Sequence, residues 1–69
     1  MTLLTRALRL EAREQRAFKF RLDDAMKALR EDEKGATYAV LESCRMRAHE
    51  TETALQHEAE ALDRYARID

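Results

Sequence analysis

The residues that carry chemistry are few in this chain: one cysteine, two histidines and scattered carboxylates. His49 and His57 match neither the His-Glu-x-x-His pattern of zinc proteases nor the Glu-x-x-His spacing of carboxylate di-iron bundles. Cys44 has no histidine close to it along the same helix face to act as its base. We therefore expect no catalytic residue, no metal site and no cofactor, and we predict that the protein is not an enzyme.

The composition is that of a small helical protein. The 69 residues are 45% hydrophobic and 39% charged, with one Gly and no Pro. With a single Gly and no Pro to form turns, the chain is poorly suited to a β-sandwich or an α/β fold. A single cysteine excludes an internal disulfide and suits the reducing cytosol. No apolar run approaches the roughly 18 residues of a membrane span, so we expect a cytoplasmic all-α protein without a membrane contact.

Apolar residues recur with alternating spacings of four and three in the first half of the chain, as in a coiled coil. This row is interrupted by two polar residues and runs through Leu4, Leu8, Glu11, Gln15, Phe18, Leu22, Ala25 and Leu29. The second half has a similar row, made of Leu41, Cys44, Ala48, Thr51, Leu55, Ala59, Leu62 and Ala66. The two rows are out of phase on one continuous helix, which predicts a break between them.

Gly35 is the natural place for that break, as a left-handed residue that ends the first helix. Thr37 is then the best candidate to cap the second helix. Glu31, Asp32 and Glu33 conflict with a helix that ends after them, because anions are unfavourable at a helix C-terminus. The break is therefore expected between Asp32 and Thr37. We predict one domain over 1–69, with helices over about 3–33 and 38–67 and a turn near 34–37.

The predicted fold is an all-α antiparallel hairpin. A turn near residue 35 places Leu29 opposite Leu41, Leu22 opposite Ala48, Gln15 opposite Leu55, and Leu8 opposite Leu62. The expected core consists of Leu4, Leu8, Phe18, Leu22, Leu29, Leu41, Ala48, Leu55 and Leu62. Five of the eight residues in the second row are Ala, Cys or Thr, so this core is too thin to offset the entropy of ordering the chain. We expect a partner or a second copy to complete it.

The partner surface is expected on the first helix. Leu3, Leu10 and Ala17 form a second apolar stripe beside the main row, and Phe20 lies nearly opposite Phe18 on the helical wheel. These four residues are the predicted partner-binding residues. A wide core-facing side would also explain the stripe.

Charge is distributed unevenly between the two halves. Residues 1–30 hold eight basic and four acidic side chains, whereas residues 31–69 hold five and ten. Mutual attraction of antiparallel helices explains this division. The basic row Arg6, Arg9, Arg13 and Arg16 also suggests phosphate binding, but the acidic second half would repel nucleic acid. We do not expect nucleic acid as the main partner.

Several positions resemble the small E-component co-chaperones of type III secretion needle subunits. They are Arg21-Leu22, Ala25-Met26, Leu29, Gly35, Tyr38, Leu41 and Ala54-Leu55, and the resemblance covers roughly residues 3–62. It implies a cytoplasmic adaptor that pairs with a tetratricopeptide-like chaperone. Together the two proteins would cover the aggregation-prone helices of the needle subunit until export.

Two alternatives remain open. Two copies of the hairpin could form a four-helix bundle, with the shape of the plasmid copy-number regulator that binds paired RNA loops, and the arginine row would then contact RNA. The chain could also be a small phage-type inhibitor that docks on a larger enzyme.

Overall fold

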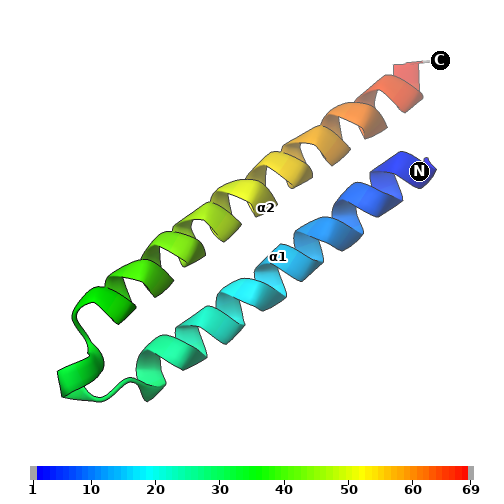
Figure 1. Ribbon diagram of the computed structural model, residues 1–69. Coiled ribbons are helices and arrows are strands. Elements are labelled where there is room, and N and C mark those ends of the chain that lie inside the picture. Colours follow the sequence, from blue (N-terminus) through cyan, green and yellow to red (C-terminus); the bar gives the residue numbers. More distant parts are fainter. Residues whose placement is uncertain (1, 69) are drawn as a thin grey trace.

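Two long helices form an antiparallel hairpin in the computed structural model (Figure 1), which describes residues 2–68 and, for side chains, residues 2–65. Helix α1 spans Leu3–Ala28, a short 3-10 turn η1 spans Glu31–Glu33, and α2 spans Ala36–Ile68. The described residues contain no strand. The predicted all-α hairpin is confirmed.

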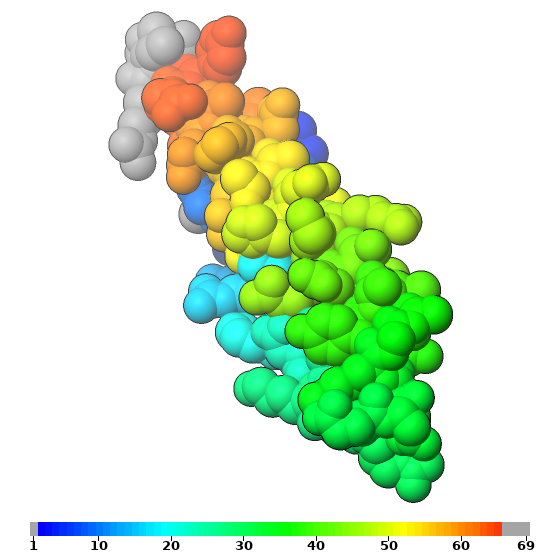
Figure 2. All heavy atoms as spheres, turned by 90° about the vertical axis from the view of Figure 1, so that its left-hand side faces the viewer, coloured from blue at the N-terminus to red at the C-terminus, as the bar shows by residue number. Residues whose placement is uncertain are grey.

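The molecule is a rod, with a Cα envelope of 58 × 13 × 11 Å. The two chain ends lie together at one end of the rod, and η1 lies at the other (Figure 1). From the side, α2 runs the length of the rod in front of α1 (Figure 2). A hairpin this narrow has a single line of contact between its helices, so most of each helix surface remains open.

The start of α1 is fixed by a threonine cap. The Thr5 backbone N–H donates to the Thr2 hydroxyl at 3.0 Å, and the two threonine hydroxyl oxygens lie 2.9 Å apart. Such a bond satisfies one of the backbone donors that a helix N-terminus leaves free. Thr5 itself is fully buried, so the cap also closes the open end of the interface between the helices.

The connection begins five residues earlier than expected, because α1 ends at Ala28 rather than near residue 33. Leu29 and Arg30 are extended, with ψ angles of 136° and 162°. The chain thus leaves the helix before its acidic cluster, which would be unfavourable at the negative end of α1. The acids instead form η1, ahead of the favourable N-terminus of α2.

Gly35 is not a left-handed residue, so that expectation is wrong. No residue of the described chain has a positive φ, and the chain reverses direction over the whole connection, through the extended pair, η1 and the turn at Lys34 and Gly35. Helix α2 begins at Ala36, and the Ala39 N–H donates to the Gly35 carbonyl at 3.2 Å. Thr37 therefore lies inside the first turn and does not cap α2.

The helix interface follows a row displaced by one residue from the predicted row on α1. Both rows share Leu8, Gln15, Leu22 and Leu29, but the intervening positions are Thr5, Ala12, Lys19 and Met26 instead of Leu4, Glu11, Phe18 and Ala25. Thr5, Ala12, Leu22 and Met26 are buried, whereas Leu8, Gln15, Lys19 and Leu29 are partly buried.

Two expected core residues are consequently outside the core. Leu4 is 57% exposed and Phe18 is 38% exposed, so their assignment to the core is corrected. The displaced row buries Met26 where the predicted row had the smaller Ala25. At another position it buries Ala12 where the predicted row had the charged Glu11. It also brings Lys19 to an acidic partner on α2, and these three gains outweigh the exposure of Phe18 and Leu4.

On α2 the interface follows the predicted row closely. Ala48 and Ala59 are buried, and Leu41, Cys44, Leu55 and Leu62 are partly buried. The exception is Glu52, which is buried where Thr51 was expected. The side chain of Ala66 lies outside the described residues.

Candidate interaction surfaces

The hairpin has two long sides, one on each flank of the helix interface. One flank carries ion pairs between the helices, and we call it the ion-pair side. It consists of Arg9, Arg16, Lys19 and Asp23 on α1, and of Arg45, His49, Glu52, Gln56 and Asp63 on α2. The other flank contains Phe18, and we call it the Phe18 face. It consists of Leu4, Glu11, Phe18 and Ala25 on α1, and of Cys44, Thr51, Glu58 and Tyr65 on α2.

Three ion pairs join the helices along the ion-pair side. Arg9 lies 2.9 Å from Asp63, Lys19 lies 2.5 Å from Glu52, and Arg45 lies 2.6 Å from Asp23. From one pair to the next, the residue number rises on α1 and falls on α2, so the three pairs fix the antiparallel register of the hairpin.

The central pair is part of a polar layer inside the interface. The side chains of Lys19 and Glu52 are only 17% and 10% exposed. The Lys19 ammonium also lies 2.9 Å from His49 Nδ1, and the Gln56 amide donates to Glu52 at 3.4 Å. The hydrogen bond from Lys19 holds the pKa of the Glu52 carboxyl below its usual range, although burial acts in the opposite direction.

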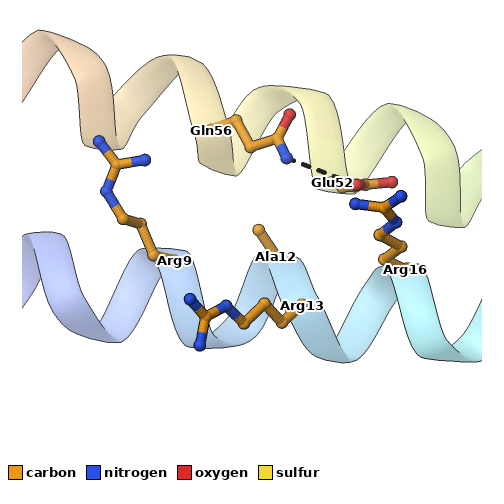
Figure 3. A pocket seen from close by; sticks show the side chains of 6 residues that line it. All are labelled: Arg9, Ala12, Arg13, Arg16, Glu52 and Gln56. Carbon is orange, nitrogen blue, oxygen red and sulfur yellow. Dashed lines mark hydrogen bonds between the residues drawn. The ribbon is translucent and has the colours of Figure 1, made fainter.

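The predicted arginine row lies partly on this side. A shallow groove between the helices is lined by Arg9, Ala12, Arg13, Arg16, Glu52 and Gln56 (Figure 3). Arg9 is engaged by Asp63, and the Arg16 guanidinium lies beside Glu52 in Figure 3 and 5.8 Å from the Phe20 ring centroid. Acidic groups of α2 thus neutralise part of the row, which weakens it as a phosphate-binding surface.

The Phe18 face has a different character. Phe18 borders a shallow groove with Gln15, Cys44, Arg47, Ala48 and Thr51. Leu4 and Tyr65 lie at the open end of this face, and Tyr65 is 74% exposed. Among the described residues, no ion pair joins the two helices across it. Exposed apolar side chains can mark a protein contact surface, although Phe20 and Met46 are exposed outside this face.

The four predicted partner-binding residues do not form one surface. Leu3, Leu10 and Ala17 are all exposed and lie on the outer side of α1, next to the Phe18 face. Phe20 is 57% exposed but borders the ion-pair side, in a groove with Arg16, His49 and Glu52. Leu4 and Phe18, which the sequence had placed in the core, are exposed as well.

Other kinds of site receive no support within residues 2–68. No group of three His, Cys, Asp or Glu side chains there is arranged to hold a metal ion. No helix in that range combines the length and apolar character that a membrane span requires. Comparisons of the chain with protein-family models, curated proteins and solved structures found no match.

Proposed function

We propose that this chain is a small helical interaction module that binds an apolar helical surface with its Phe18 face. The observation that carries the proposal is the exposure of Leu4, Phe18 and Tyr65 on one long side of the hairpin. Leu3 and Leu10 extend that apolar area around α1. Their burial against a partner would supply hydrophobic free energy that the thin interface between the two helices lacks.

The specific form of the proposal is a cytoplasmic adaptor in type III secretion. The resemblance to the needle-subunit co-chaperones supports it. The mechanism would be to cover apolar helix surface, without any catalytic step.

Thermal unfolding followed by circular dichroism tests the general proposal. A module completed by association should melt at a temperature that rises with protein concentration over an about 100-fold range, or with added partner. A high melting temperature that responds to neither would contradict it. Co-expression with a needle subunit and its tetratricopeptide-like chaperone tests the specific form, which predicts a soluble complex in place of aggregated needle subunit.

A further inference from the structure

We propose that a second copy of the chain occupies the Phe18 face, with the two hairpins packed antiparallel and their turns at opposite ends of a four-helix bundle. This inference rests on the proposed function, because it takes the Phe18 face as the contact surface. It goes further by naming the occupant and its orientation.

The face is large enough for a stable dimer. A standard interface takes about 800 Å² from each partner, which is about one seventh of the 5514 Å² accessible surface of the hairpin. One long side of a rod exceeds that fraction. Apolar side chains of the face lie at its open end, Leu4 and Tyr65, and at its centre, Phe18. Toward the turn the exposed Val40 extends the same flank, because it lies seven residues before Arg47 on α2.

Charges on and beside the face are separated along its length. Toward the open end it carries Glu11, Glu14 and Glu58, and toward the turn it carries Arg21 and Arg47. The Arg21 guanidinium lies 5.8 Å from the Phe18 ring centroid, and Arg47 borders the groove beside Phe18. Glu14 lies four residues before Phe18, and Glu58 seven residues after Thr51, so helical spacing places both acids along this flank.

Four of these charges, Glu14, Arg21, Arg47 and Glu58, are self-complementary about one point, whereas the position symmetric to Glu11 on α1 is Asp24, so Glu11 gains no basic partner. Glu14 and Arg21 are equally distant from the gap between Ala17 and Phe18. Arg47 and Glu58 are equally distant from the gap between Glu52 and Thr53. The Lys19–Glu52 ion pair shows that the two gaps lie at nearly the same level of the rod.

A two-fold axis at that level, perpendicular to the rod, brings opposite charges together on both helices. Each α1 then lies antiparallel to the partner's α1, with Glu14 near the partner's Arg21. Each α2 lies antiparallel to the partner's α2, with Glu58 near the partner's Arg47. The two Phe18 rings lie close to the axis. A two-fold contact repeats each of these pairs, as an isologous interface requires.

The arrangement with both turns at the same end brings like charges together. In that dimer α1 would face the partner's α2, with Glu14 near the partner's Glu58 and Arg21 near the partner's Arg47. Like-charge juxtaposition across an interface suppresses the wrong arrangement. The charge pattern thus selects the orientation as well as the occupant.

Sedimentation equilibrium of the intact chain tests the occupant. The wild-type protein should approach twice its monomer mass of 8.1 kDa. Phe18→Glu should weaken dimerisation by at least about 30-fold. Phe20→Glu, the same change two residues away on the opposite side of α1, should leave it within about threefold of wild type.

Two further measurements test the orientation. Glu14→Arg alone should weaken the dimer by about 5- to 10-fold, and adding Arg21→Glu in the same chain should restore it. Spin labels at Leu3→Cys, in a Cys44→Ser background that sedimentation shows to dimerise like the wild type, should lie about 45 Å apart in the proposed dimer and about 25 Å or less in the same-end dimer.

Each outcome has a defined meaning. A monomeric wild-type protein at all concentrations overturns this inference, while the proposed function survives if an added helical partner still raises the melting temperature. A dimer that Phe18→Glu leaves intact overturns the choice of face. A dimer with short label distances, or without rescue by the double charge reversal, overturns the orientation.

Discussion

Phe18 and Lys19 are neighbours in the sequence, yet the aromatic ring lies at the exposed edge of the helix interface and the charged side chain lies largely inside it. The Lys19 side chain is 17% exposed, whereas Phe18 is 38% exposed. Lys19 is satisfied within the chain, because its ammonium lies against both Glu52 and His49. Phe18 contacts the edge of the helix interface and lies beside the Arg21 guanidinium.

The two sides of the rod therefore have different roles. Polar contacts along the ion-pair side set the register of the hairpin, a role that buried polar residues also have in coiled coils. The Phe18 face retains apolar surface that the hairpin alone does not bury. Internal specificity and external binding capacity therefore come from adjacent rows of the same helix.

The largest expected effect concerns the interface that both sides border. Leu22 is 8% exposed at the centre of the interface, so Leu22→Ala should cost about 2–5 kcal/mol of unfolding free energy. In so small a protein, loss of that much stability should abolish most of the helical circular dichroism signal. Leu10→Ala is the matched control, since Leu10 is 53% exposed, and should cost about 0.5 kcal/mol or less. Equal losses for the two variants would refute the observed helix phase.

The next effect concerns the Lys19–Glu52 pair. Lys19→Met leaves Glu52 buried without its cation and should cost about 3 kcal/mol, and Glu52→Leu should cost a similar amount. The double variant should cost less than either single variant, since two apolar side chains then meet in the interface. A double-mutant cycle by urea denaturation measures this coupling. Additive losses would show that the pair does not stabilise the hairpin.

The same pair makes stability depend on pH. The pKa of Glu52 is lowered in the folded protein from its ordinary value of 4.5, so the folded state favours the ionised carboxylate. Its contribution is fully present above pH 4.5 and is lost as the pH falls through the lowered folded-state pKa. Unfolding measured from pH 7 down to pH 2 should show this loss, and Glu52→Gln should show a smaller one. An identical acid dependence of the two proteins would assign the effect to other carboxylates.

The general fold follows from the sequence, because the absence of Pro favours long helices and the two apolar rows with Gly35 between them predict a break. The row on α2 was also predictable, since its leucines repeat every seven residues. The row on α1 was not. Leu4 and Phe18 compete there with Thr5 and Lys19, and apolar spacing alone favours the leucine and the aromatic ring.

What decides the α1 row is information about the other helix. Lys19 becomes an interior residue only when Glu52 lies opposite it, and no pattern within α1 contains that fact. The connection depends on a similar balance, since the acids of η1 favour an early end to α1 over a longer helix that would end at Gly35. Local electrostatics could have identified the early break from the sequence.

The smallest expected effect distinguishes the two phenylalanines. A core position for Phe18 would make Phe18→Ala cost about 3–5 kcal/mol, but its observed exposure reduces the expected cost to about 1 kcal/mol. Phe20→Ala should cost about 0.5 kcal/mol or less, because Phe20 is 57% exposed. Thermal unfolding at low protein concentration should therefore give similar melting temperatures for both variants. At high concentration the two should diverge, because association stabilises only proteins with an intact Phe18 face. If the Phe18→Ala protein is unfolded even in dilute solution, Phe18 belongs to the core. If the melting temperatures of the two variants change in parallel at all protein concentrations, the Phe18 face does not mediate self-association.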